Sequence, residues 1–183
     1  AETEFESDAM VFILSITGGA VAVGVSVAIG INLLNAQTYI GTTPMGTVKD
    51  GAQGEGMGLI QSDSVTVTSD VGGGTSIIGV GVVGGAVAVN GIVALGFNWA
   101  TGIAAVYKAN ITTGDLTITA IMDGDVNVNG LAVVGGAVAV GATVAVGYQK
   151  TDNRALLDAT GSTVTATGDI GVYAGTADDP YNS

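Results

Sequence analysis

The hexapeptide GGAVAV occurs three times in this 183-residue chain, at residues 18–23, 84–89 and 135–140. The copies start 66 and 51 residues apart, and each begins a longer run in which bulky and small residues alternate. Self-similarity of this kind is typical of repeat architectures, in which each repeat stacks on its neighbours. We therefore predict a single β-repeat domain of residues 1–183, with repeats at roughly 9–69, 75–120 and 125–174.

Each GGAVAV run alternates strictly between two kinds of side chain. One parity of the first run begins with Val21 and Val23, and the other begins with Ala22 and Gly24. A period of two is that of a β-strand, whose successive side chains point to opposite faces. We expect the bulky parity to form the core, so that an aspartate at Val89 would be severely destabilising. The predicted core residues are Val21, Val23, Val25, Val27, Val87, Val89, Val93, Leu95, Val138, Val140, Val144 and Val146.

The small-residue parity has two interpretations that the sequence leaves open. A flat face lets another backbone approach closely, which favours stacked coils or sheets, or contact between subunits. Alternatively, the small residues fill a tight layer inside one molecule.

The segments around each GGAVAV run also predict strands. A short apolar strand precedes each run. The Gly-Gly pair lies at the junction, where glycine lowers the conformational cost of a bend or bulge. A closing strand ends each repeat, at 63–69, 114–120 and 168–174. The alternating carboxylates of residues 2–8 indicate either an acidic edge strand or a strand that pairs with a neighbouring subunit. Asn32, Asn98 and Gln149 align between repeats, so their amides either form a hydrogen-bonded ladder or simply suit a turn.

Two segments fall outside the repeat pattern. Residues 42–58 contain Pro44 and several glycines, which predicts a loop insertion in the first repeat. This insertion is a candidate for a specific contact, because binding is often placed on loops that protrude from a regular scaffold; a tolerated insertion is the alternative. Residues 175–183 are polar and contain the second proline, which indicates a tail or a boundary.

Composition excludes several function classes. The net charge is −12, from sixteen acidic and four basic residues, so the chain lacks the basic footprint that nucleic-acid binding needs. No stretch reads as a transmembrane helix, and membrane insertion is not expected. The chain has no cysteine and no histidine, which removes disulfides, the commonest general base and the commonest metal ligand. An acidic, cysteine-free, β-rich chain fits the outside of a bacterial cell.

Few residues carry recognisable chemistry. Asp123 and Asp125 could present carboxylates to calcium, but that cation prefers six or more oxygen ligands, so we assign no metal site. Lys150, Asp152 and Arg154 alternate along one strand face, which is typical of a surface charge cluster and, less often, of a carbohydrate-cleaving groove. No catalytic residue, cofactor or enzymatic activity is predicted.

The repeat unit resembles a family of proteins. GGAVAVxxxVAVG, followed by a polar corner, a strand like QTYI and then STVTATGDIGVYA, is similar to the repeats of large secreted bacterial surface proteins. These are the leukotoxin-like and filamentous-haemagglutinin-like adhesins exported by autotransporter or two-partner routes. The resemblance covers nearly the whole chain and implies a right-handed parallel β-helix that serves as a rigid stalk.

The expected fold is all-β, a repeat β-solenoid and preferably a right-handed parallel β-helix. A β-sandwich or barrel-like subunit of an extracellular filament is the alternative. The expected function is a non-enzymatic structural or adhesive segment of a secreted or cell-surface protein. A self-assembling subunit of a filament or sheath is the second hypothesis, and a carbohydrate-active β-helix is the third. The expected partners are further copies, neighbouring repeats, or a host-cell or matrix surface.

Overall fold

A computed structural model describes residues 1–41 and 59–176, and within these ranges the chain forms eleven strands and no helix. The predicted insertion at 42–58 lies outside the described residues, as does all of the predicted tail except residues 175 and 176. The strands are β1 (Glu2–Glu6), β2 (Ala9–Gly18), β3 (Val21–Gly41), β4 (Ile60–Gly72), β5 (Thr75–Gly84), β6 (Val87–Tyr107), β7 (Ile111–Asp123), β8 (Val126–Gly135), β9 (Val138–Asp158), β10 (Val164–Ala166) and β11 (Ile170–Gly175).

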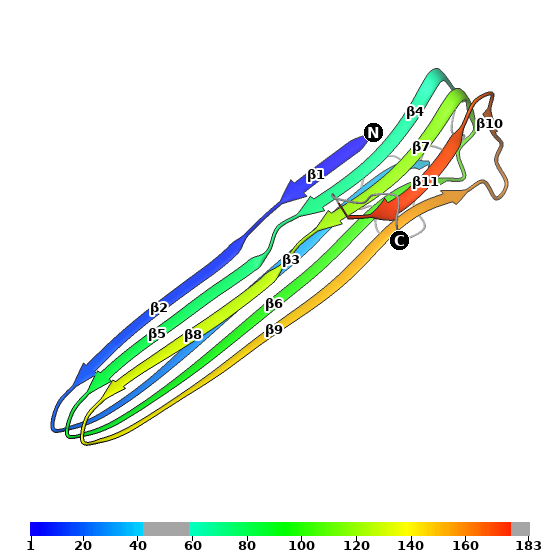
Figure 1. The fold of residues 1–183 in the computed structure, drawn as a ribbon. Coiled ribbons are helices and arrows are strands. Elements are labelled where there is room, and N and C mark those ends of the chain that lie inside the picture. Colours follow the sequence, from blue (N-terminus) through cyan, green and yellow to red (C-terminus); the bar gives the residue numbers. More distant parts are fainter. Residues whose placement is uncertain (42–58, 177–183) are drawn as a thin grey trace, which may run out of the picture.

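All the strands pair in parallel, in three sheets. Sheet A has the order β1-β4-β7-β10, with β11 also pairing with β7; sheet B has the order β2-β5-β8; and sheet C has the order β3-β6-β9. Each repeat runs from sheet A directly into sheet B, turns, and returns along sheet C (Figure 1). The prediction of an all-β chain with stacked parallel strands is confirmed, and the arrangement is compatible with a β-helix or solenoid.

The strands of sheet C are the longest, and their register follows the sequence repeat. β3, β6 and β9 each contain 21 residues. Val21 pairs with Val87, and Val87 pairs with Val138, so the three GGAVAV copies lie side by side. The predicted register of equivalent residues is therefore confirmed. The acidic segment at Glu2–Glu6 does form an edge strand, because among the described strands β1 pairs only with β4.

The Gly-Gly pairs form the turns between sheets B and C. Gly19 follows β2, and Gly85 and Gly136 hold the same place after β5 and β8. A Cβ on Gly85 would collide with the carbonyl oxygen of Gly19, and one on Gly136 would collide with that of Gly85. The second glycine of the pair is thus required because the backbone of the preceding repeat occupies the space of a side chain.

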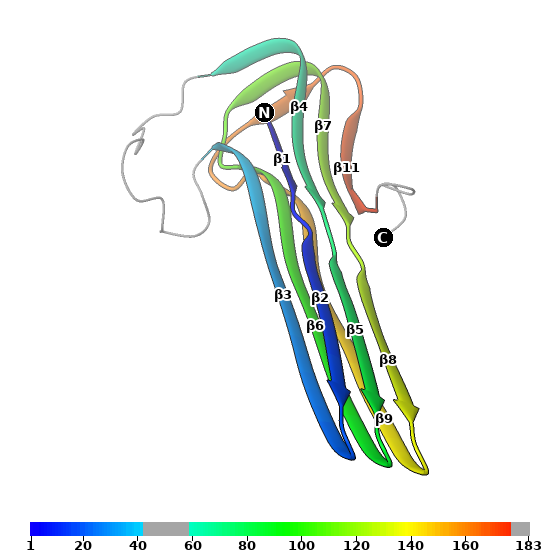
Figure 2. The ribbon, with the colours of Figure 1, turned by 90° about the vertical axis from the view of Figure 1, so that its left-hand side faces the viewer.

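The three turns lie together at one narrow end of the molecule, where sheets B and C face each other as two layers (Figure 2). Sheet A and the termini of the described chain lie toward the other end (Figures 1 and 2). We call the end with the Gly-Gly turns the tip and the opposite end the base.

The predicted core is wrong, because the bulky parity of the GGAVAV runs faces outward. Val25 is 72% exposed and Val89 is 40% exposed, whereas Ala22 and Ala88 are at most 2% exposed. Of the twelve predicted core residues, ten are exposed and two, Val93 and Leu95, are only half-buried. The outward-facing residues of the prediction are Val21, Val23, Val25, Val27, Val87, Val89, Val93, Leu95, Val138, Val140, Val144 and Val146.

The side chains of sheet B explain this inversion. A Cβ on Gly30 would lie 3.0 Å from Ile77 Cδ1, and one on Gly96 would lie 2.7 Å from Val128 Cγ2. The inward-facing valines and isoleucines of sheet B therefore occupy the space that the glycines of sheet C leave free. Two layers of bulky side chains would overfill the same gap. The small parity thus fills a tight layer inside one molecule, which is one of the two interpretations open from the sequence.

The base has a more conventional core. Between sheets A and C, branched side chains from β4 and β7 pack against alanines and Val106 of β6. The fully buried members include Val67, Ile111, Leu116 and Ile118. This cluster holds the two layers together at the base, whereas the tip relies on alanine and glycine against a single bulky layer.

Candidate interaction surfaces

The outward side of sheet C is a continuous apolar surface, which we call the outer C face. It begins at the tip and consists of seven rows of side chains that cross β3, β6 and β9, and Lys150, at the β9 end of the seventh row, is the one charged residue among them. The exposed large apolar residues of the face are Val21, Val23, Val25, Val27, Ile29, Ile31, Leu33, Val87, Val89, Trp99, Val138, Val140, Val144, Val146 and Tyr148.

Sheet B also exposes apolar side chains, on the opposite side of the tip. Met10, Phe12, Leu14 and Ile16 project from β2 with more than half of each side chain exposed. The surface is interrupted elsewhere, because exposed Asn127 and Asn129 and half-buried Ser76 share the outward parity. This outer B face is therefore smaller and more polar than the outer C face.

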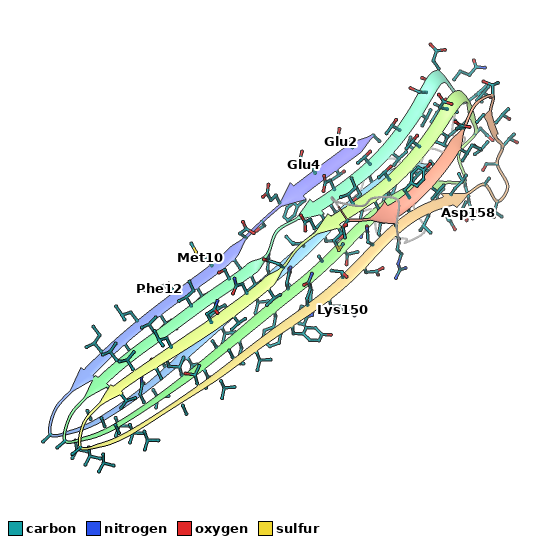
Figure 3. All side chains as sticks on the ribbon, viewed as in Figure 1. Glu2, Glu4, Met10, Phe12, Lys150 and Asp158 are labelled. Carbon is teal, nitrogen blue, oxygen red and sulfur yellow. The ribbon has the colours of Figure 1, made fainter. Side chains whose placement is uncertain are left out.

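Among the described residues, the charged side chains lie toward the base and are absent from the tip. Residues 9–41, 75–107 and 126–149 contain no aspartate, glutamate, lysine or arginine, and they include all of sheet B and most of sheet C. The carboxylates of β1, including Glu2 and Glu4, lie toward the base, and so do Lys150 and Asp158, whereas Met10 and Phe12 lie toward the tip (Figure 3). The tip is thus apolar on both sides, and the charged side chains of the described residues lie toward the base.

Lys150, Asp152 and Arg154 share the outward parity of β9, as the alternation predicted. Arg154 donates two hydrogen bonds to Asp152, from Nε to Oδ1 at 2.5 Å and from Nη2 to Oδ2 at 2.6 Å. Both side chains are substantially exposed, so this pair contributes little to stability. The trio lies on a flat sheet surface at the border of the apolar rows.

Asp123 and Asp125 lie where β7 passes into β8. Among the described residues, no group of three or more acidic side chains could hold a cation. Asp123 ends β7 and Asp125 lies between β7 and β8, and both are exposed. The backbone of this segment has a structural role, because Thr75 N–H donates to the Asp125 carbonyl oxygen at 3.0 Å.

The aligned amides bond across the molecule instead of along a ladder. Asn32 Nδ2 donates to the Ser7 carbonyl at 2.6 Å. Asn98 donates to the carbonyl of Gly73 at 3.2 Å, and Gln149 donates to that of Gly124 at 2.8 Å. These carbonyls all lie where sheet A passes into sheet B, so each amide ties sheet C to that junction. Both expectations, the ladder and the turn, are therefore wrong, and the amides lie within long strands.

A hollow of about 320 Å³ lies beside the last repeat, lined by residues that include Asp123, Gln149 and Asn153. Its amides are engaged with backbone, because Asn153 Nδ2 donates to the carbonyls of Ala120 at 3.0 Å and Gly175 at 2.8 Å. Asp123 is its single ionisable lining residue among those described. One carboxylate without a second ionisable group is a poor basis for acid–base chemistry.

The inward side of β9 is open at the same edge. Ala139 and Ala145 of β9 are exposed, whereas their partners in β6, Ala88 and Ala94, are fully buried. β6 is covered on its inward side by β5 and β8, while β9 packs among the described elements mainly on β8 and, from sheet A, on β7 and β11. A strand with the inward residues of sheet B would fit this position.

Comparison with protein-family models, with curated proteins and with solved structures finds no match for the chain. In the described part of the chain there is no helix of the length and hydropathy that crossing a membrane requires. The candidate surfaces therefore rest on the geometry of this chain alone.

Sequence reasoning missed the outer C face as a surface, because it assigned the same residues to the core. One signal pointed the other way. The inward positions near the turns are mostly glycine and alanine, with Asn90 as an exception. A core made from the bulky parity would have left these small residues toward water with few polar groups to hydrate.

Proposed function

We propose that this chain is a structural and adhesive segment of a bacterial extracellular surface protein, built as a right-handed parallel β-helix and without a catalytic role. The observation that carries the proposal is the unbroken register of sheet C, in which 21 consecutive positions pair from β3 to β6 and again from β6 to β9. Repeats that contact only their neighbours give a stiff, quasi-one-dimensional body.

The surface supports the same proposal. A rod that bears apolar side chains on two sides can adhere to apolar or mixed surfaces, because contact removes those side chains from water. The acidic base keeps the chain soluble. The candidate partners are a host-cell or matrix surface and neighbouring repeats of the same kind.

The self-assembling subunit of a filament or sheath remains the second candidate, and the open inward side of β9 favours it. The uncovered alanines there are partners of fully buried ones in β6, so the next layer would be a strand like β2 or β5. Such growth would extend sheets B and C along the stacking direction.

Electron microscopy of the purified chain separates these two candidates. Isolated short rods support the stalk segment, and long fibres one rod wide support the filament. Globular particles without a long axis would contradict both. Antibodies raised against the purified chain should label intact, unpermeabilised cells of the source organism; labelling that requires permeabilisation would overturn the surface location.

Adhesion is tested with beads coated with the purified chain, passed under flow over polystyrene, collagen and fibronectin. Retention well above that of albumin-coated beads on at least one surface is expected. Retention equal to that of albumin on all three would remove the adhesive part of the proposal and leave the structural part.

A further inference from the structure

We propose that the outer C face is a dimerisation surface, on which a second copy of this chain packs face to face about a two-fold axis that runs along β6. The pairing goes beyond the function proposed above and does not depend on it, since a lateral dimer can form in a stalk, a filament or an isolated chain.

The area of the face meets the requirement of a stable dimer. The apolar rows span 13 residues from Val21 to Leu33, which at about 3.3 Å per residue is about 40 Å, and three strands are about 14 Å wide. Each copy thus offers about 600 Å², and two copies bury about 1,200 Å², the lower bound of a standard interface. Aligned sheets pack in this way at about 10 Å separation.

The shape of the face is self-complementary about this axis, because projecting side chains of one copy meet small residues of the other. The axis places β3 of one copy opposite β9 of the other and keeps each row opposite the same row. In the third row Val25 is 72% exposed, whereas its neighbours are Gly91 and Ala142. A Cβ on Gly91 would meet no atom within 4 Å, so the row has a hollow beside a projection. Val25 of each copy therefore fits over Ala142 of the other, and Gly91 faces Gly91.

The polar rows nearer the base are compatible with the same axis. Asn35 aligns with Thr101 and Asp152, so the axis places Asp152 of one copy opposite Asn35 of the other. In the next row toward the base, Arg154 of one copy faces Gln37 of the other. No charge meets a like charge, and Asp152 and Arg154 each meet an amide that can hydrogen-bond to them. Lys150 of the seventh row faces Leu33 at the outer edge of the sheet, where its alkyl chain can pack while its ammonium group reaches water.

Aromatic side chains mark the end of the apolar rows. The ring of Phe97 lies 6.3 Å from that of Trp99 and 6.4 Å from that of Tyr148, centroid to centroid. Trp99 lies on β6 and therefore on the proposed axis, where it would face its own counterpart. Tryptophan and tyrosine are enriched among the residues that anchor protein interfaces, and here they would close the base-ward end of the buried patch.

A second copy fits this surface better than lipid does. Among the described strands β3 and β9 each pair with β6 alone, so both leave a strand edge whose N–H and C=O groups have no partner in the described sheets. A lipid interior offers these groups no hydrogen-bond partner, which is costly. Packing between two sheets leaves the same edges open to water.

Sedimentation of matched variants tests the proposal. The purified chain is expected to reach a monomer–dimer equilibrium, and Val25→Lys is expected to weaken dimerisation at least about 30-fold, since it places an ammonium group against Ala142. Met10→Lys is the control, because Met10 is 79% exposed on the opposite side of the tip. It should leave the dimer constant unchanged, and circular dichroism should find the parental β content in both variants.

Cross-linking tests the axis itself. The chain has no cysteine, so Gly91→Cys provides a single thiol, which a short bismaleimide should join to its own counterpart in most dimers. Mixing Val25→Cys with Ala142→Cys should join the two variants to each other, far more than Val25→Cys joins to itself. Val80→Cys, on the outer B face, is the control that should remain uncross-linked.

Three outcomes would overturn the proposal. One is a chain that stays monomeric at millimolar concentration. Another is a dimer that Met10→Lys weakens as much as Val25→Lys does, which would place the interface elsewhere. The third is a monomer that cosediments with phosphatidylcholine vesicles and loses this binding on Val25→Lys, which would make a lipid surface the partner of the face.

Discussion

The carbonyl oxygen of Gly19 occupies the place that a side chain of Gly85 would need, although the two residues belong to different repeats. Gly136 has the same relation to Gly85 one repeat later. The turns at the tip are thus stacked directly on one another, backbone against backbone, and the second glycine of each pair is where the repeats lie closest.

Gly85→Ala is expected to lower the free energy of unfolding by about 2 to 3 kcal/mol, because the methyl group must push the stacked turns apart. Gly84→Ala is the matched control, since a Cβ there would meet no atom within 4 Å. It should cost much less. Urea unfolding of the two variants provides the comparison, and equal midpoints would show that the turns are not stacked.

The inward and outward parities of sheet C predict opposite effects for two adjacent substitutions. Ala88→Asp places a carboxylate at a fully buried position and should abolish folding or cost several kcal/mol. Val89→Asp places the same group where the side chain is 40% exposed, and it should preserve the fold. Circular dichroism and thermal melting test both. If Val89→Asp unfolds and Ala88→Asp does not, the valine face of sheet C is the buried one and the orientation described here is wrong.

Asn90 is buried, and neither its amide nitrogen nor its amide oxygen has a hydrogen-bond partner. Its aligned residues are Gly24 and Gly141, so the fold does not need an amide there. Asn90→Ala should therefore stabilise the protein by about 1 kcal/mol, because it removes an unsatisfied buried polar group.

Asn98→Ala should have the opposite sign, since Asn98 Nδ2 donates to the Gly73 carbonyl and its loss leaves that carbonyl without the amide. Chemical denaturation of both amide variants provides the measurement. A destabilised Asn90→Ala would indicate that the amide is satisfied in solution.

Asp123 and Asp125 should be dispensable for stability. Replacing both with asparagine is expected to shift the melting temperature by no more than a few degrees, because both side chains are exposed and form no acidic cluster with a third residue of the described chain. Addition of a chelator to the parental protein should leave the melting curve unchanged. A large fall in melting temperature with the chelator would reveal a bound cation.

The sequence alone determined the strands, the repeat and the register. The alternation in each run requires a strand, because only a strand separates Val21 from Ala22 onto opposite faces. The recurrence of GGAVAV aligns Val21, Val87 and Val138, and parallel stacking follows, because identical segments pair best in register. The positions of the turns could also be predicted, because a Gly-Gly pair between two apolar runs lets the backbone reverse direction with little strain.

Which face of sheet C points inward was decided by the tertiary structure. The sequence of a run shows that the side chains on its two faces differ in size. Burial of the larger side chains is then the default expectation. The opposite layer reverses that expectation. Ile77 and Val128 of sheet B project into the gap, and they fit only where Gly30 and Gly96 leave space.

The candidate surface depended on the same decision. Once the gap is filled from sheet B, the valines of sheet C must face outward, where they form the outer C face. Such a choice depends on the volume available between two layers that are distant in sequence. Periodicity within one strand contains no information about that volume, so the sequence could reveal the two faces of sheet C but not which one the protein buries.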